Sequence, residues 1–74
     1  MKTLKYRSRG QDVYVLEELL ETLGYEVSIS TYFGKDTDEA VRQFQAGNGL
    51  VVDGIVGPKT WACLLYTSPS PRDA

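Results

Sequence analysis

The chain has 74 residues, a formal net charge of −2, no His, one Cys and one Trp. This length corresponds to one small domain at most, because domains usually contain about 50–250 residues. Without His, the side chain that most often binds transition metals and acts as a base at neutral pH is absent. A lone Cys forms neither an internal disulfide nor a zinc site. An isoelectric point near 4.9 argues against a nucleic-acid module, and no apolar run approaches the roughly 20 residues of a membrane span. Composition predicts a small non-catalytic module that uses no cofactor and no metal.

The first periodic segment predicts a helix over about residues 10–23. Gly24 follows it, where a left-handed C-terminal cap favours Gly. The sequence Ser8-Arg9-Gly10-Gln11 has the form of a capping box, which places the helix start near Ser8 or Gly10. The glutamates Glu17, Glu18 and Glu21 are interpreted as solvated surface rather than as a catalytic carboxylate pair. The apolar stripe that faces the core consists of Val13, Leu16, Leu19, Leu20 and Leu23.

Two more helices are predicted downstream. Residues 25–33 are rich in β-branched and aromatic types, but no partner strand is evident, so an extended connection is expected. A second helix begins after Gly34 and ends at residues 47–49, which read Gly-Asn-Gly. An apolar loop over 50–57 then leads to Pro58, which suits the first position of a third helix.

A short pattern occurs twice, at a spacing of 23 residues. Residues 32–37 and 55–60 both read apolar, apolar, Gly, two variable residues and Thr, and both precede or begin a helix. We interpret them as two similar helix entries, in which Thr37 and Thr60 bond back to the N-terminus of their own helix. Two copies are too few for a solenoid. The pattern therefore predicts an all-α, compact three-helix bundle with structured connecting loops.

Three linked motifs then resemble the bacterial peptidoglycan-binding domain over about residues 4–62. Residues 4–25 read L-x3-S-x-G-x2-V-x2-L-x2-L-L-x2-L-G-Y, residues 33–45 read F-G-x2-T-x2-A-V-x2-F-Q, and residues 49–61 read G-L-x2-D-G-x-V-G-P-x-T-W. The resemblance implies a three-helix fold and a non-catalytic role in anchoring hydrolases, amidases, transpeptidases or phage endolysins to the cell wall. Two departures stand out. Ser30-Thr31 replaces an Asp-Gly, which predicts a looser turn, and Glu17 stands where Gln is common.

A peptidoglycan binder needs an aromatic platform, hydrogen-bonding groups and a cation for a carboxylate. The candidates flank the predicted middle helix and are expected to converge: Tyr32, Arg42, Gln45, Asn48 and Asp53. Each also has a structural interpretation. Asp53 heads an Asp-Gly turn, Gln45 and Asn48 can end a helix, Arg42 can pair with Asp38, and Tyr32 can be buried. Trp61 is assigned to the core rather than to sugar binding.

The end of the chain has a different character. Residues 63–73 can be translated without mismatch from DNA that resembles a transposase-based sequencing adapter; a natural Pro/Ser-rich linker is the alternative. We expect the domain to occupy residues 1–62, with a third helix that runs to about 66, and residues 63–74 to be an adapter-derived, disordered tail. On this hypothesis the natural protein continues past Ala62, into a second binding repeat or a catalytic domain.

The predicted partner is peptidoglycan, through both its sugar and its peptide stem, with no nucleic-acid or membrane partner and a monomeric state. The predicted place of action is the bacterial wall or the extracellular or periplasmic space, including release from a phage-encoded protein; no signal peptide is recognised in this chain. An interaction or autoinhibitory domain on the same fold is the alternative. Such propeptides carry a Pro-Arg-Cys-Gly switch, whereas Cys63 lies between Ala62 and Leu64. A hydrolase is disfavoured because no nucleophile–base arrangement is present.

Overall fold

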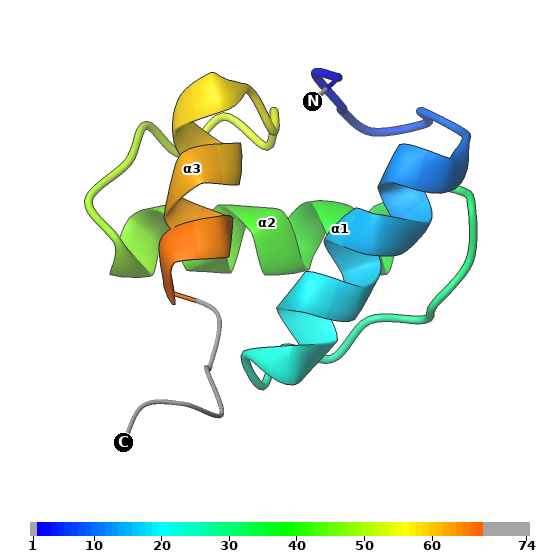
Figure 1. Cartoon of the computed structure of the whole chain (residues 1–74), viewed down its shortest axis with the longest axis horizontal. Helices are drawn as coiled ribbons and strands as arrows, with labels where there is room; N and C mark the ends of the chain where they lie inside the picture. Colours follow the sequence, from blue (N-terminus) through cyan, green and yellow to red (C-terminus); the bar gives the residue numbers. More distant parts are fainter. Residues whose placement is uncertain (1, 68–74) are drawn as a thin grey trace.

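The computed structural model describes residues 2–67, which form three helices. They are α1 (Gln11–Thr22), α2 (Lys35–Gly47) and α3 (Pro58–Thr67). Both α1 and α3 run across α2 (Figure 1), and α1 contacts each of the other two helices. The predicted all-α three-helix fold is confirmed. No helix among the described residues is long and apolar enough to cross a membrane.

Helix α1 ends at a glycine-dependent cap. Gly24 has φ 101°, a left-handed conformation that a side chain would strain. The Gly24 N–H donates to the carbonyl of Glu21, and the Tyr25 N–H donates to that of Leu20, both at 3.0 Å. These two bonds constitute a Schellman motif. The predicted C-terminal cap is therefore confirmed.

The predicted capping box at the start of α1 is wrong. Gly10 is the N-cap and makes no side-chain capping bond. Ser8 instead lies outside the helix, because its carbonyl accepts a 2.8 Å bond from the Phe33 N–H. Its hydroxyl accepts the Lys5 N–H at 3.0 Å. Ser8 therefore pairs with Phe33 in the connection between α1 and α2 and does not cap the helix.

The N-terminal segment, residues 2–10, joins both connections. Arg9 pairs with Tyr32, and Leu4 pairs with Val56, each in an isolated antiparallel bridge. Leu4 and Val56 exchange two backbone hydrogen bonds, at 2.7 and 3.1 Å. Within the described part of the chain, residues 25–33 are an extended connection without a partner strand, as predicted. Their β-bridge pairing with the N-terminal segment is limited to the isolated bridge between Arg9 and Tyr32.

Helix α3 begins at Pro58, as predicted, and continues to Thr67. The expected continuation of this helix to about residue 66 is close to its observed end, so residues 63–67 belong to α3. Leu64 is fully buried, so an apolar residue in this part of the chain completes the packing of α3. The remainder of the proposed tail, residues 68–74, lies outside the described residues.

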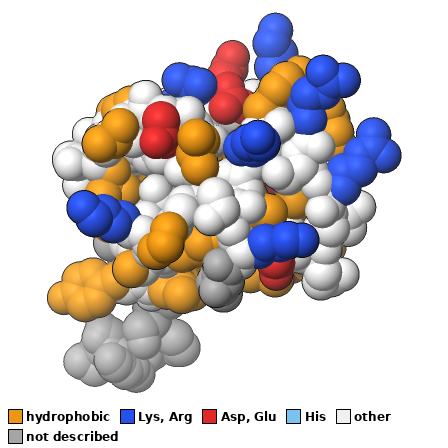
Figure 2. Space-filling model, turned by 90° about the horizontal axis from the view of Figure 1, so that it is seen from above, with side chains coloured by type: hydrophobic (Ala, Val, Ile, Leu, Met, Phe, Trp, Pro, Cys, Tyr) orange, Lys and Arg blue, Asp and Glu red, His pale blue; other side chains and the backbone are white. Residues whose placement is uncertain are grey.

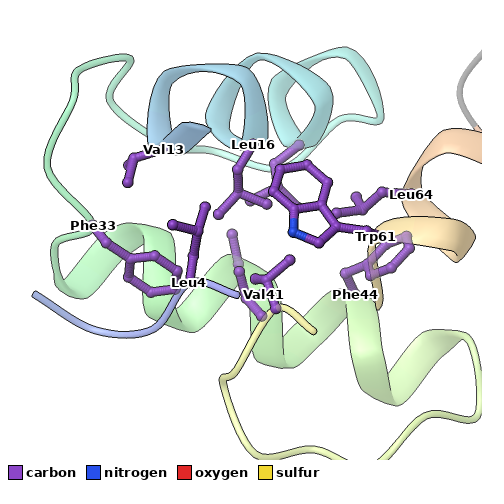
Figure 3. Packing of buried hydrophobic residues seen from close by; sticks show 11 residues of the cluster. Leu4, Val13, Leu16, Phe33, Val41, Phe44, Trp61 and Leu64 are labelled. Atoms are coloured by element: carbon purple, nitrogen blue, oxygen red, sulfur yellow. The ribbon is translucent and has the colours of Figure 1, made fainter. Parts of the chain in front are cut away.

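The hydrophobic core lies between the three helices and includes side chains from both connections (Figure 3). Trp61 is 3% exposed, in agreement with its assignment to the core, and its indole N–H donates to the Lys2 carbonyl at 2.8 Å. Tyr25 and Phe44 meet edge to face with ring centroids 6.2 Å apart. The buried hydrophobic residues are Leu4, Val13, Leu16, Leu20, Phe33, Ala40, Val41, Phe44, Val56, Trp61 and Leu64.

Candidate functional site

The connection between α2 and α3 is built around the side chain of Gln45. Its amide oxygen accepts the N–H groups of Asp53 and Gly54, at 3.1 and 3.0 Å. Its amide nitrogen donates to the Asp53 carboxylate and the Ile55 carbonyl, both at 3.0 Å, and to the Thr60 hydroxyl at 3.3 Å. Gln45 is 1% exposed. All of its polar atoms are engaged, so it shapes the loop from within.

Asp53 and Gly54 form the tight turn that this loop requires. The Asp53 carboxylate accepts the Ile55 N–H at 2.9 Å. That bond, followed by the one from Gln45, holds the pKa of Asp53 below its ordinary value. Gly54 is buried with φ 74°, and a Cβ there would lie 2.6 Å from a carboxylate oxygen of Asp38. Only glycine lets the loop approach α2 this closely.

Arg42 is held against the same turn. Its Nε lies 3.2 Å from an Asp38 carboxylate oxygen, an i,i+4 ion pair on α2. Its Nη2 donates to the Asp53 carbonyl at 3.4 Å. The pairing with Asp38 that the spacing suggested is therefore present. Arg42 already has two protein partners, although its side chain remains 48% exposed.

An open, mainly apolar groove of about 420 Å³ lies beside this turn. Val51 and Ile55 are exposed apolar residues of its lining, at 77% and 40%. Asp53 provides polar atoms on the same surface. The residues that line the groove are Gln45, Leu50, Val51, Asp53, Ile55, Gly57, Pro58, Lys59 and Thr60. A groove with apolar walls and a few fixed polar groups is typical of a ligand site.

The connection between α1 and α2 repeats this architecture around Glu17. Its carboxylate accepts the Ser30 N–H and the Thr37 hydroxyl, each at 2.6 Å. The Ser30 hydroxyl accepts the Tyr32 N–H at 3.2 Å, as the Asp53 carboxylate accepts that of Ile55. The Ser30-Thr31 substitution therefore keeps this turn bond.

Glu17 is fully buried, so its assignment to solvated surface was wrong. Burial raises the pKa of the Glu17 carboxyl; the bonds from Thr37 and Ser30 offset part of this effect, and the nearby Asp36 carboxylate adds to it. Its position indicated burial, because it lies four residues after Val13 and three before Leu20, on the apolar stripe. The acidic residue type concealed that signal.

The two repeated threonines bond to other helices rather than to their own helix starts. Thr37 donates to Glu17 on α1, and Thr60 accepts from Gln45 on α2. The short repeat therefore corresponds to two equivalent polar clusters, each with a buried side chain from the preceding helix at its centre. The expected bond from each Thr to its own N-terminus is replaced by a contact between helices.

The structure brings together three of the five predicted site residues, namely Arg42, Gln45 and Asp53. Tyr32 precedes the first turn of α2, whereas Asn48 follows its last turn. The 13 residues of α2 span about 20 Å at roughly 1.5 Å per residue, so these two side chains do not converge. Asn48 is exposed, and its amide donates to the Phe44 carbonyl at 2.8 Å. Tyr32 is 37% exposed.

A family described as "Putative peptidoglycan binding domain" matches residues 9–64, which include both polar clusters and the groove. The chain belongs to this family. The domain is a binding module, and its relatives occur as parts of cell-wall hydrolases, endolysins, transpeptidases and proteases. Family membership associates it with the bacterial cell wall.

Three similar proteins illustrate where such a peptidoglycan-binding domain occurs. The crystal structure of the Burkholderia AP3 phage endolysin matches with a TM-score of 0.85 and 44% identity, over 99% of this chain and 28% of that one. The spore cortex-lytic enzyme of Halalkalibacterium halodurans is 37% identical over 73 residues, 97% of this chain and 22% of the enzyme. An uncharacterised protein of Kitasatospora aureofaciens is 50% identical over 61 residues, 80% of this chain and 52% of that protein. The chain thus spans about half or less of each of these relatives.

Proposed function

We propose that this domain binds peptidoglycan without cleaving it and holds an attached hydrolase or endolysin catalytic domain at the cell wall. The observation that carries the proposal is the family match over residues 9–64, which contains the groove and the loop that forms it. The relatives include a spore cortex-lytic enzyme and a phage endolysin, and in each the matching region is a minor part of a longer chain.

The loop between α2 and α3 provides the polar and apolar contacts that such a ligand requires. Peptidoglycan carries N-acetyl groups, peptide amides and carboxylates. The apolar wall at Val51 and Ile55 suits methyl and ring CH groups, and the Asp53 carboxylate, exposed beside it, suits amide N–H donors. Because the side chains of Gln45 and Arg42 form hydrogen bonds with this loop, the binding surface is preorganised.

The five candidate residues accordingly take two roles in this proposal. Tyr32, Asn48 and Asp53 are exposed and are proposed to contact the wall polymer. Gln45 is proposed to position Asp53, since it has no exposed polar atom to offer. Arg42 is proposed to do both, because it holds the Asp53 carbonyl while its side chain remains partly exposed.

Co-sedimentation of the purified chain with insoluble peptidoglycan, stripped of protein and of other wall polymers, tests the proposal. Val51→Asp introduces a charge into the groove and is expected to lower the bound fraction several-fold. Val52→Asp is the matched control, because Val52 is exposed at 47% but does not line the groove. Absence of wild-type sedimentation would refute peptidoglycan binding, and equal loss in both variants would refute the groove as the contact surface.

A further inference from the structure

Short antiparallel pairing places Arg9 and Tyr32 side by side on the molecular surface. The Phe33 N–H donates to the Ser8 carbonyl at 2.8 Å, and the Gly10 N–H donates to the Thr31 carbonyl at 2.9 Å. These bonds flank the Arg9–Tyr32 bridge, so the two residues form a non-hydrogen-bonded pair, whose side chains share one face of the ladder. The next residue, Phe33, points the opposite way and is fully buried.

The guanidinium of Arg9 lies over the ring of Tyr32, with Cζ 5.1 Å from the ring centroid. The ring itself is held against Gly34, since a Cβ at that position would lie 3.6 Å from the ring atoms Cδ2 and Cε2. A guanidinium stacked on an aromatic ring keeps its N–H groups directed outward in a planar fork. The ring thus gives the Arg9 cation a neighbour without using any of its N–H groups.

The backbone of Arg7, two residues before Arg9, forms part of a strained turn. The Ser8 N–H donates to the Lys5 carbonyl at 2.9 Å, which closes a four-residue turn, and the Arg7 N–H donates to the Phe33 carbonyl at 2.8 Å. Arg7 has φ 78°, the left-handed conformation that favours glycine at the third position of such a turn. Arg7 therefore occupies a position where glycine would suit the backbone better, and local strain of this kind is found where a side chain has a use.

Both guanidiniums are available to an anion. Within residues 2–67, neither Arg7 nor Arg9 has a carboxylate within ion-pair distance or a side-chain hydrogen bond to the protein, whereas Arg42 has both. Figure 2 views the molecule from the side of the N-terminal segment and shows Lys and Arg side chains spread over this face, with fewer acidic ones. An approaching oxyanion meets a positive surface despite the net charge of −2.

We propose that Arg9, stacked on Tyr32, and Arg7 form a binding site for a carboxylate of the peptidoglycan peptide stem. The assignment rests on the proposed function and replaces Arg42 as the principal cation for that carboxylate. The site is distinct from the apolar groove, because no residue of the groove belongs to it. The phosphodiesters of other wall polymers offer the same oxyanion chemistry, so the experiment must separate the two sources.

Titration calorimetry with soluble muropeptides provides the test. Two ligands are compared that differ only in whether the stem carboxylates are free or amidated. The wild-type chain is expected to bind the free form about tenfold more tightly, which corresponds to about 1.4 kcal/mol, because hydrogen bonds to a charged oxyanion are stronger than those to a neutral amide. Arg9→Gln is expected to lose most of this preference, because only the Arg7 cation of the site remains. Lys2→Gln removes the same charge from an exposed side chain and is expected to keep the preference.

A second variant separates binding from folding. Arg7→Gly relieves the left-handed strain, so its melting temperature is expected to be no lower than that of the wild type, while its preference for the free carboxylate falls. Equal wild-type affinity for the two muropeptides, or an undiminished preference in Arg9→Gln, overturns the site while leaving co-sedimentation with peptidoglycan intact. Loss of binding in Arg9→Gln that is seen only with walls retaining phosphodiester polymers, and not with the muropeptides, also overturns the carboxylate assignment. If the wild type binds neither muropeptides nor purified walls, the proposed function fails as well.

Discussion

Replacement of Glu17 by Ala tests whether the buried carboxylate joins α1, α2 and the connection between them. The side chain is fully buried and accepts two hydrogen bonds, from the Ser30 N–H and the Thr37 hydroxyl, each at 2.6 Å. Thr37 is itself fully buried. Truncation leaves both donors without their partner and opens a small cavity in the packed interior.

The expected loss is about 3 kcal/mol in the free energy of unfolding. Each donor deprived of its partner costs about 1–2 kcal/mol, and the cavity adds about 1 kcal/mol. Removal of a desolvated charge offsets roughly 1 kcal/mol of this total. For a domain of this size, a loss of about 3 kcal/mol lowers the melting temperature by roughly 12–24 °C. Because small domains have only about 0.05–0.15 kcal/mol of stability per residue, the effect is a large fraction of the whole.

Urea denaturation followed by circular dichroism and by Trp61 fluorescence measures the change. Glu18→Ala is the matched control, an adjacent glutamate on α1 that is exposed, and its effect should stay within about 0.5 kcal/mol. Thr37→Val supplies a milder variant that removes one bond and should cost about 1 kcal/mol. A loss below about 1 kcal/mol in Glu17→Ala, or a loss equal to that of Glu18→Ala, would refute the structural role.

Three further predictions concern the same polar clusters. Folding raises the pKa of Glu17 above its ordinary value of 4.5, so the folded state binds the Glu17 proton more tightly than the unfolded state does. The stabilisation that this proton gives is complete below pH 4.5 and is lost as the pH rises through the folded-state pKa of Glu17. The difference in unfolding free energy between wild type and Glu17→Gln should therefore change across that window and level off on either side, whereas a constant difference from pH 4 to 8 would contradict the raised pKa. Gln45→Ala should cost about 3 kcal/mol in urea denaturation, against less than about 0.5 kcal/mol for the exposed Gln43→Ala; equal effects would exclude Gln45 as the centre of the loop. Gly54→Ala should cost about 2 kcal/mol, because its φ of 74° is strained for alanine and its Cβ would meet Asp38 at 2.6 Å; a melting temperature equal to that of the wild type would show that the loop relaxes freely.

The three helices could be predicted from local signals. The apolar periodicity of α1, the cap at Gly24 and the start at Pro58 each depend on neighbouring residues along the chain, and these elements begin and end within about one or two residues of the prediction. Trp61 was also assigned to the core from its place in a motif at a helix start. Such features need no knowledge of distant contacts.

The N-terminal segment could not be predicted in the same way. Its bridges from Arg9 to Tyr32 and from Leu4 to Val56 join positions far apart in sequence, and single bridges leave no alternating pattern. The hydrogen bond from the Phe33 N–H to the Ser8 carbonyl, beside the Arg9–Tyr32 bridge, is also why Ser8 does not form the predicted capping box. Long-range pairing of irregular segments therefore decided the geometry of the surface that we propose to bind the peptide stem.

The candidate site was predicted in part. Arg42, Gln45 and Asp53 meet because one loop folds back on α2, but chain proximity alone did not reveal that Gln45 faces inward. Glu17 was missed because an acidic residue suggested solvent, although the Gln45 cluster has the same construction and uses a neutral amide. The 23-residue repeat indicated that equivalence, since it aligns Thr37 with Thr60.

Titration of the ¹⁵N-labelled chain with a soluble muropeptide, followed by amide chemical shifts, shows whether and where the domain binds peptidoglycan. We expect saturable shifts in the loop around Val51 and Asp53 and in the ladder around Arg9 and Tyr32. The opposite end of α1, near Glu21, should remain unchanged. Absence of saturable shifts at any residue, or shifts confined to the end of α1, would contradict peptidoglycan binding by these surfaces.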